Sequence, residues 1–410
     1  MRVDILETEL FSRYFSDVIG KNNLLPVNGV STDSRDIKKG DLFLAIKGKN
    51  FDGSEFVGEA LSGGAIYAIV QSGDENHNTF LVDDVISFIG KICSQWMNDF
   101  DGNVIAITGS NGKTTTKDLI SHILSKKGYD ISKTEGNFNT SIGVPLSIFS
   151  FPHNASQVYV LELGANRLGD IEYLSSIVKP DIGVITNISD AHLEGFGSIE
   201  NIIKEKKSIL THSKKGYYNE NIPEPFRGLV NHPLGKNKVF LENASIACKV
   251  CEDFMLEEDL VKFDELLQDF TLPKGRGEVC LLSNNITLID DGYNANPESV
   301  KAAIDNLQNY QTEGKKIFVF GDMKELGKFS KKLHLNFKKK IEDNKIFKVY
   351  TIGEEMKNLH NVLPTSIEKF HADNLDELFV DLKKIIKSQD IILFKGSRAM
   401  KLDKIINKFK

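Results

Sequence analysis

A glycine-rich segment, Gly109–Thr115, carries the residues of this chain that are best suited to hold phosphate. It reads GSNGKTT and lies between the apolar run NVIAIT and the amphipathic stretch TTKDLISHILSKKG. Glycines let backbone N–H groups close around phosphate oxygens, and a helix that begins there adds partial positive charge. Lys113 can then reach the β- and γ-phosphates, and the hydroxyl of Thr114 can bind Mg²⁺.

This loop departs from the general G-x-x-x-x-G-K-[ST] pattern, because the first glycine would fall at Ile107. Only the shorter G-x-x-G-K-T core is present, and the alternative is a glycine-rich turn that arose by chance. An apolar strand before the loop and a helix after it favour phosphate binding. The segment therefore predicts a nucleoside triphosphate site made by Gly109, Ser110, Asn111, Gly112, Lys113, Thr114 and Thr115.

Acidic and histidine side chains follow two further apolar runs. Glu162 ends the run VYVLE, and Asp190 and His192 come shortly after DIGVITNI. The carboxyl ends of parallel strands meet at one edge of a sheet, where ligands bind. A buried carboxylate is costly unless it is paired or metal-bound, so Glu162 is expected to bind Mg²⁺ rather than to cap a helix or form an ion pair. His192 is either a metal ligand or a structural histidine, and its place at the same edge favours the ligand.

The segment Ser198–Leu210, SIENIIKEKKSIL, places a lysine where an apolar side chain is expected. At about 100° per residue, five apolar residues share one helix face. These are Ile199, Ile202, Ile203, Ile209 and Leu210. Lys206 lies seven residues after Ile199 and therefore falls about 20° from it, near the centre of that face. Lys204 points away from the face, and Lys207 lies at its flank.

Two interpretations of Lys206 remain open from spacing alone. In the first, its stem packs on apolar surface and its head reaches water or Glu205. In the second, the neutral amine carries CO₂ as a carbamate, which turns a cation into an oxygen ligand for Mg²⁺. Burial favours the neutral amine that carbamate formation needs.

Composition excludes several classes of protein. A formal charge of −6 argues against general nucleic-acid binding. The N-terminal residues have no long apolar region and are not a secretory signal, and no apolar run is long enough to span a membrane, so a cytoplasmic protein is expected. Four cysteines do not suggest a disulfide framework, and the C-x-x-C of Cys248 and Cys251 has no second ligand pair for zinc. Both are expected to be small apolar residues of a helix.

The 410 residues are too many for one ordinary core, and the pattern of strands and helices predicts three α/β domains. Short strands and one helix predict a small domain over residues 1–84. Alternating apolar strands and helices predict a parallel sheet with the phosphate loop over residues 85–297. A second alternation with lysine-rich helices predicts a Rossmann-like domain over residues 298–410. The polar, proline-containing stretch 212–240 is expected to be irregular.

Seven segments of this chain, in their order along it, resemble motifs of the ATP-dependent Mur ligases of peptidoglycan synthesis, and more narrowly those of the MurF type. They are AITGSNGKTTTK, GNFNTSIGVPLSIF, ELGANRLGDIEYL, NISDAHLEGFGSI, DDGYNANPESVKAAI, GDMKELG and FKGSRAMKLD. STDSRDIKKGDLFLAIKGKNFDG near the N-terminus resembles the uridine-binding domain of that type. The resemblance covers nearly the whole chain, and AHLEGFGS with YNANP separates this type from its sister ligases.

The resemblance implies an N-terminal UDP-substrate domain, a central ATPase domain and a C-terminal Rossmann-like domain. It implies that ATP phosphorylates the terminal carboxylate of UDP-N-acetylmuramoyl-tripeptide, and that the amine of D-alanyl-D-alanine attacks the acyl phosphate. The products are the pentapeptide cell-wall precursor, ADP and phosphate. The implied cofactors are two Mg²⁺ ions and CO₂ as a carbamate on Lys206. A monomer that binds small-molecule substrates and no nucleic acid is expected.

Site residues carry over only where this sequence matches the motifs. Lys113, His192 and Lys206 match catalytic positions, and the metal ligands match Thr114, Glu162, His192 and carbamylated Lys206. The ATP site adds Arg276, Asn294, Asn296 and Asp322. The positions that match substrate-binding residues are Thr32, Asp33, Ser34, Arg35, Asn139, Thr140, Lys395, Ser397 and Arg398. The stretch 212–250 is unlike the family, so no nucleotide contact is carried over to it, and Ser54 stands where a histidine is common.

Other functions remain possible from the sequence. A sister Mur ligase would add a different amino acid, and a folylpolyglutamate-type ligase would share the phosphate loop, although the STDSR domain argues against the folate type. A P-loop switch, in which nucleotide binding drives a partner interaction, is a different class that the loop alone also allows. Dependence of phosphate release on both substrates separates a ligase from a switch. The third residue of the peptide, diaminopimelate or lysine, does not follow from these motifs.

Overall fold

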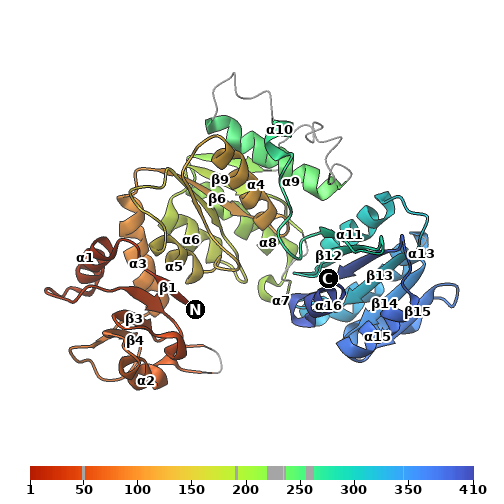
Figure 1. Ribbon diagram of the computed structural model, residues 1–410. Helices are drawn as coiled ribbons and strands as arrows, with labels where there is room; N and C mark the ends of the chain where they lie inside the picture. The colour runs from red at the N-terminus through yellow and green to blue at the C-terminus, as the bar shows by residue number, and fades with distance from the viewer. Residues whose placement is uncertain (49–50, 190–192, 219–233, 235–236, 255–262, 345) are drawn as a thin grey trace. The chain divides into compact units, whose positions relative to one another are not determined.

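The computed structural model of the chain describes residues 1–48, 51–189, 193–218, 234, 237–254, 263–344 and 346–410. Within these residues the strands form three sheets (Figure 1). The chain divides into two compact units, one of residues 1–108, 124–185 and 205–217 and the other of residues 109–123, 186–204 and 218–410. None of the helices in the described part of the chain has the length and apolar character that a bilayer crossing requires.

The N-terminal sheet has the strand order β1-β2-β3-β4-β5. β1 pairs antiparallel with β2, and the other neighbours are parallel. The sequence predicts β3, β4, β5 and the helix between β3 and β4, whereas β1 and β2 are too short to show a pattern. The elements are β1 (Arg2–Asp4), α1 (Thr8–Ile19), β2 (Gly29–Ser31), β3 (Asp41–Leu44), α2 (Val57–Ser62), β4 (Tyr67–Val70) and β5 (Thr79–Leu81).

The helix α3 (Val85–Asn98) follows the N-terminal sheet and packs against α1 and against two later helices, α5 (Gly143–Phe149) and α6 (Asp170–Val178). Asp84 caps its first turn by accepting a hydrogen bond from the Ser87 N–H. Apolar residues recur at helical spacing along its length, and Trp96 at the end of this stripe contacts the rings of Tyr14 and Phe149. The N-terminal and central sheets of the first unit therefore share one packed helix.

The central sheet has the order β10-β9-β6-β8-β7, in which β6 pairs in parallel with β8 and β9, and β7 with β8. This order places the first strand of the domain in the middle of the sheet, as crossover connections require. Its strands are β6 (Asn103–Thr108), β7 (Ile131–Lys133), β8 (Val158–Glu162), β9 (Ile182–Ile185) and β10 (Lys215–Tyr218). Its other helices include α4 (Lys113–Lys126), α7 (Leu193–Phe196) and α8 (Ile199–Lys207), with a 3₁₀ turn at Ser208–Thr211.

The stretch predicted to be irregular contains the strand β10, and residues 219–233 and 235–236 of it lie outside the described residues. The helix α9 (Lys238–Cys251) begins within the last residues of this stretch, and a 3₁₀ turn at Glu252–Phe254 and α10 (Phe263–Leu267) come after it. Cys248 and Cys251 are buried in α9, and burial raises the pKa of both thiols. Their environment is that of small apolar core residues, as the sequence predicts.

The C-terminal sheet has the order β11-β12-β16-β13-β14-β15 and is parallel except for the β11–β12 hairpin. Its strands are β11 (Glu278–Leu281), β12 (Thr287–Asp291), β13 (Lys316–Gly321), β14 (Lys348–Ile352), β15 (Glu368–Ala372) and β16 (Ile391–Lys395). Its helices are α11 (Pro297–Asn309), α12 (Ser330–Leu335), α13 (Phe337–Asp343), α14 (Glu354–Val362), α15 (Leu375–Ile385) and α16 (Asp403–Phe409), with 3₁₀ turns at Gly327–Phe329 and Arg398–Met400.

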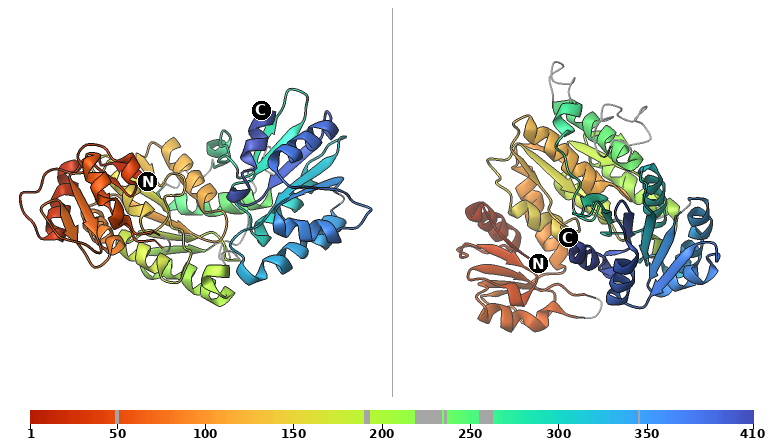
Figure 2. Two further views of the ribbon diagram at one scale, coloured as in Figure 1. Left: turned by 90° about the horizontal axis from the view of Figure 1, so that it is seen from below. Right: turned by 45° about the vertical axis from the view of Figure 1, so that its right-hand side comes forward.

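Alternate residues of β13 build two separate cores. Phe318 and Phe320 face the core shared with α11, α13 and α14, whereas Ile317 and Val319 face the core shared with α15 and α16. Helices accordingly cover both faces of this sheet (Figure 2). β11 and β12 lie before residue 298, yet β12 pairs with β16, so the sheet of the C-terminal domain extends back to Glu278.

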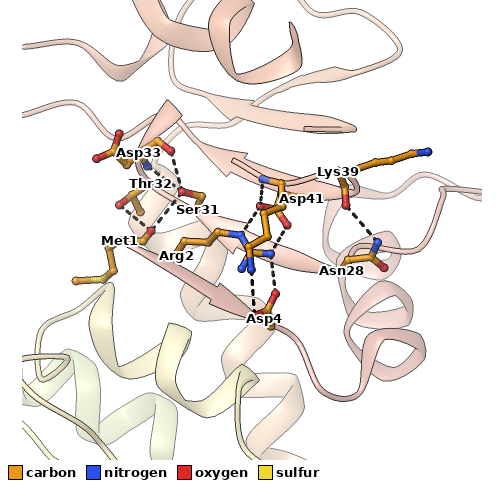
Figure 3. Close-up of polar contacts among 10 residues, drawn as sticks. Met1, Arg2, Asp4, Asn28, Ser31, Thr32, Asp33, Lys39 and Asp41 are labelled. Atoms are coloured by element: carbon orange, nitrogen blue, oxygen red, sulfur yellow. Dashed lines mark hydrogen bonds and ion pairs between the residues drawn. The ribbon is translucent and has the colours of Figure 1, made fainter. Parts of the chain in front are cut away.

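A buried ion pair joins the first strand to the rest of the N-terminal sheet. The guanidinium of Arg2 donates to both carboxylate oxygens of Asp41, at 2.7 and 2.9 Å, and also pairs with Asp4 (Figure 3). The Asp41 carboxylate is fully buried and also accepts from the Lys38 N–H, whereas Asp4 is 66% exposed. These partners raise the pKa of Arg2 further above its usual range.

We predict that Asp41→Ala lowers the free energy of unfolding by about 3 kcal/mol, because it leaves a mostly buried guanidinium without its main partner. Asp4→Ala is the matched control and should cost less than about 1 kcal/mol, since its carboxylate is exposed to water. Urea unfolding of the two variants measures both values. Equal losses would show that burial of the Arg2–Asp41 pair does not matter.

Candidate active site

The glycine-rich loop connects the end of β6 to the start of α4. Gly109 has φ of +147° and Gly112 has φ of +82°, both in the region that favours glycine. A Cβ at Gly109 would lie 2.0 Å from Thr186 Oγ1, and one at Gly112 would lie 2.3 Å from Asn243 Oδ1. Both positions therefore require glycine for conformation and for space.

The segment after β9 holds this loop through hydrogen bonds. Asn187 accepts from the Ser110 N–H with its backbone oxygen at 2.9 Å and from the Asn111 N–H with Oδ1 at 2.7 Å. The Ser110 hydroxyl accepts from the Ser189 N–H at 2.9 Å, and the Thr186 hydroxyl donates to the Asn111 backbone oxygen at 2.5 Å. Asn187 and Ser189 are site residues that the sequence did not single out.

Lys113 lies over the loop that it follows. Its Nζ donates to the backbone oxygens of Gly109, at 2.7 Å, and Ser110, at 3.4 Å. Thr114 and Thr115 are buried in the first turn of α4. A lysine head, a helix N-terminus and a glycine backbone thus meet at one short segment, which is the combination that binds phosphate.

Asn296 reaches the loop from a distant part of the chain. Its Nδ2 donates to Asn111 Oδ1 at 2.6 Å, and Asn111 Nδ2 donates to Glu298 Oε2 at 3.1 Å. Asn187 Nδ2 donates to the same Glu298 oxygen at 2.9 Å. Asn296 also caps α11, with a reciprocal bond to Ser299. The structure therefore brings the expected residues Asn111 and Asn296 together and adds Glu298.

Asn243 of α9 contacts the same loop. Its Oδ1 accepts from the Thr116 hydroxyl at 3.4 Å and occupies the space beside Gly112. No nucleotide contact is expected in this part of the chain from the family resemblance, because its sequence is unlike the family. A signal was present, because an asparagine buried on the apolar face of LENASIACKV needs a polar partner.

Positively charged side chains surround the segment that follows β12. Lys395 is buried, pairs with Asp291 Oδ2 at 3.1 Å and donates to the Asn294 backbone oxygen at 2.5 Å. Burial raises the pKa of Asp291, and Lys395 and Arg276 oppose this rise. Asn294 is therefore brought beside Lys395 through its backbone.

Tyr293 is contacted by both expected arginines. The Arg276 guanidinium lies 4.2 Å from the ring centroid and that of Arg398 lies 5.2 Å from it. Arg398 also donates to the Tyr293 hydroxyl at 3.3 Å. A tyrosine ring orients guanidinium groups by cation–π attraction. Tyr293 was missed because its role depends on arginines far away in sequence.

Asp322 and Ser397 join the loops after β13 and β16. Asp322 is 1% exposed, its Oδ1 accepts from the Met356 N–H at 3.0 Å and its Oδ2 pairs with Lys324 at 2.9 Å. Ser397 donates its N–H to the Asp322 backbone oxygen at 3.0 Å, and its hydroxyl accepts from the Lys324 N–H at 2.8 Å. The Asp322 carboxylate thus caps α14, where Gly353 offers no side chain.

Glu162 ends β8 as a buried carboxylate, as the sequence predicts. Asn139 Nδ2 donates to its Oε1 at 2.8 Å, which brings two expected site residues together. The Thr140 hydroxyl oxygen accepts from the N–H of Gly143, the first residue of α5, at 3.2 Å. Oxygen ligands are the kind that Mg²⁺ prefers, and the Glu162 carboxylate supplies them.

Lys206 points inward from α8, as helical spacing predicts. It is 2% exposed, whereas Lys204 and Lys207 are exposed. Ile203 was expected on the inward face but is 37% exposed. The buried residues of α8 are Ile202, Glu205 and Lys206, so the inward face includes Glu205 and leaves Ile203 at its edge. The helix ends at Lys207, and Ile209 and Leu210 follow in a 3₁₀ turn.

Glu205 is buried beside Lys206 and accepts from the N–H groups of Gly169, at 2.7 Å, and Ile171, at 2.6 Å. Both amides belong to the start of α6, so Glu205 acts as the cap that Gly169 lacks. A lysine whose head reached water would be more exposed than Lys206 is. Its burial therefore argues against a head in water, whereas a contact with Glu205 stays the open alternative to the carbamate.

The N-terminal site residues lie on the loop after β2. Asp33 accepts from the Arg35 side chain at 2.7 and 2.8 Å, which holds the pKa of Asp33 well below its usual range. Ser34 donates to Glu59 Oε2 at 2.8 Å. The Thr32 N–H donates to the Met1 backbone oxygen at 2.9 Å, so β1 supports this loop (Figure 3).

Asp190 and His192 lie outside the described residues. Across the part of the chain that the structure describes, no three His, Cys, Asp or Glu side chains form a group able to hold a metal. The expected magnesium ligands are not of that kind, because they include Thr114 and a modified lysine.

Family models match almost the entire chain. The model described as Mur ligase family, catalytic domain, matches residues 26–108, and Mur ligase middle domain matches residues 107–239. Mur ligase, glutamate ligase domain, matches residues 275–398. The start of this third match agrees with the C-terminal sheet, which begins at Glu278.

Named relatives and solved structures match over nearly their full length. The UDP-N-acetylmuramoyl-tripeptide–D-alanyl-D-alanine ligase of Bacillus subtilis (strain 168) is 32% identical, over 93% of this chain and 92% of the relative. MurF from Acinetobacter baumannii superposes with a TM-score of 0.83 and 26% identity, over 97% of this chain and 98% of that one. MurF ligase from Thermotoga maritima in complex with ADP has a TM-score of 0.80 and 29% identity, over 93% and 96% of the two chains.

We predict that Gly109→Ala weakens ATP binding by about 100-fold, because the added methyl group combines a disfavoured φ with a collision at Thr186. Gly128→Ala is the control, since Gly128 has φ of +87° but open space around it. Calorimetric titration with ATP measures both affinities. Equal effects of the two variants would mean that the close approach at Thr186 is unimportant.

Proposed function

The chain belongs to the Mur ligase family, and from this premise we propose that it is a ligase of the MurF type. It joins D-alanyl-D-alanine to UDP-N-acetylmuramoyl-tripeptide and converts ATP to ADP and phosphate. The observation that carries the proposal is the phosphate loop Gly109–Thr115, joined to Asn296, in a chain that matches such ligases almost from end to end.

The reaction has two steps. A carboxylate oxygen of the tripeptide attacks the γ-phosphorus of ATP, the bond to the bridging oxygen breaks, and ADP leaves. The amine nitrogen of D-alanyl-D-alanine then attacks the acyl carbon, and a tetrahedral intermediate forms. The bond from carbon to the phosphate oxygen breaks, the nitrogen loses a proton, and an amide and phosphate result.

The first step brings two anions together, so positive charge must offset their repulsion. Lys113 and the N-terminus of α4 supply it at the phosphate loop. Arg276, Lys395 and Arg398 supply more at the segment after β12, where Tyr293 orients the two arginines. These groups bind and orient the phosphates and the carboxylate.

Mg²⁺ belongs to the proposal because the residues present suit it. Thr114 and Glu162 offer oxygen ligands, and His192 is proposed for a second ion. When bound, Mg²⁺ polarises phosphoryl oxygens and offsets their charge.

A carbamate on Lys206 is proposed as the remaining ligand. Its support is the burial of the Lys206 side chain near the end of α8. A buried amine is the kind of lysine that reacts with CO₂, because the neutral form is favoured there.

Thr32–Arg35 and the Asn139–Thr140 pair are proposed to bind the UDP-tripeptide. Arg35 is exposed on the loop after β2 and can face a diphosphate, whereas Asn139 lies beside Glu162. We further propose that the protein acts as a monomer in the cytoplasm, where its co-substrate ATP is made.

The proposal predicts a specific product. The protein, incubated with ATP, Mg²⁺, UDP-N-acetylmuramoyl-tripeptide and D-alanyl-D-alanine, should yield the pentapeptide by mass spectrometry. Phosphate release should need both peptide substrates, and Lys113→Ala should abolish it. Product with a different amine alone would identify a sister ligase. Phosphate release without either peptide would identify a switch ATPase.

The carbamate makes a second prediction. Lys206→Ala should lower the ligation rate by about 100-fold, because an oxygen ligand is lost. Short carboxylates such as formate should restore part of the rate, and CO₂ should reactivate wild-type enzyme that was depleted of it. Lys204→Ala is the matched control, as it removes an exposed lysine of the same helix. A fully active Lys206→Ala enzyme would overturn the carbamate.

A further inference from the structure

His334 of α12 is a buried histidine that no step of the proposed reaction uses. It has no exposed surface and lies beneath the loop that follows β13. Its Nε2 is 2.9 Å from the Met323 backbone nitrogen, and its Nδ1 is 2.8 Å from the Ser330 backbone oxygen. Both ring nitrogens are thus bonded to backbone groups.

These two partners determine the protonation of the ring. A backbone N–H only donates, so Nε2 must be the acceptor and carries no hydrogen. A backbone carbonyl only accepts, so Nδ1 must carry the hydrogen. His334 is therefore neutral and held in one tautomer. Protonation of Nε2 would place two N–H groups against each other.

Met323 lies between two residues that organise the loop. On one side, Asp322 caps α14 and accepts from the Ser397 N–H. On the other, Lys324 donates its N–H to the Ser397 hydroxyl and pairs with Asp322. Ser397 itself lies between Lys395 and Arg398, two of the cations proposed to bind substrate. The bond from His334 to Met323 thus supports the loops after both β13 and β16.

The backbone after Met323 is strained. Glu325 has φ of +64° and Gly327 has φ of +51°, and a residue other than glycine in this conformation has a cost of about 1 kcal/mol. A turn of this kind persists only when its surroundings fix it. The His334 ring is the group beneath it that accepts the Met323 amide.

We propose that neutral His334 is a positioning residue, which fixes the loop Asp322–Lys324 and through Ser397 the cations at the carboxyl edge of the C-terminal sheet. This inference rests on the proposed ligase function. It assigns His334 no contact with substrate.

The charges around the ring set the direction of its pH dependence. Burial lowers the pKa of His334 below its ordinary value, and Lys324 lowers it further. The Ser330 backbone oxygen, Asp322 of the loop and Glu355 of α14 oppose the shift, while Lys331 and Lys332 of its own helix are exposed. The contribution to stability is therefore complete above pH about 6.5, the ordinary value, and is lost as pH falls towards the lowered pKa.

Two variants of the full-length protein test the proposal. His334→Leu removes the acceptor, and kcat/KM for amide formation should fall about tenfold, because the Met323 amide stays buried without a partner. His334→Gln can place an oxygen at the Nε2 position and does not titrate. It should retain most of the activity and should lose less activity than wild type as pH falls through the lowered pKa of His334.

A matched control and a spectroscopic readout separate positioning from folding. His371→Gln removes a histidine of β15 whose pKa is also lowered by burial, and it should leave the pH profile as in wild type. Nitrogen-15 NMR of labelled histidine should show the Nδ1–H tautomer for His334 in the wild-type protein, whether or not the protein is a ligase.

The outcomes distinguish the two proposals. If wild type forms no amide with D-alanyl-D-alanine, the proposed function fails, and the tautomer still tests the state of His334. If wild type forms the amide and His334→Leu has the same kcat/KM and pH profile, the positioning role is overturned. It is also overturned if His334→Leu lowers only the melting temperature, or if His334→Gln is as impaired as His334→Leu.

Discussion

The phosphate loop depends on the close packing of neighbouring side chains against two of its glycines, Gly109 and Gly112. Thr186 and Asn243 occupy the space that a Cβ at Gly109 or Gly112 would need. The same side chains form hydrogen bonds, since the Thr186 hydroxyl donates to the Asn111 backbone oxygen and Asn243 Oδ1 accepts from the Thr116 hydroxyl. Glycine allows the loop many backbone conformations, and the neighbouring side chains restrict it to one. The backbone N–H groups of the loop are therefore oriented before phosphate binds.

Buried charge is the second theme of the molecule. Three of the buried charged groups described above connect one element of the structure to another. Asp41 ties β1 to its sheet, Glu205 caps α6, and Asp322 caps α14. The helices α6 and α14, whose N-cap residues are glycines, receive their caps from acidic side chains elsewhere in the chain. The charges therefore join elements that the backbone alone would leave unconnected.

Sequence patterns were sufficient for features that depend on neighbours along the chain. The loop between β6 and α4, the carboxylate at the end of β8 and the inward direction of Lys206 all followed from spacing. The side chains that complete the site did not. Asn187 and Tyr293 act on residues far from them in sequence, and no local pattern marks such a contact. The apolar face around Asn243 signals that it needs a polar partner but does not say which residue that partner is. Ile203 was expected on the inward face, but the buried residues of α8 are Ile202, Glu205 and Lys206, which leaves Ile203 at the edge of that face.

The hydrogen bond between Asn111 and Asn296 joins residues 185 positions apart. A nascent chain holds β6, the glycine loop and α4 long before α11 has left the ribosome, because synthesis proceeds from the N-terminus at about 5–20 residues per second. The Asn296 side-chain amide, which bonds to the loop, is therefore synthesised long after the loop itself. A chain that ends before Asn296 would therefore carry the phosphate-loop sequence without this hydrogen bond.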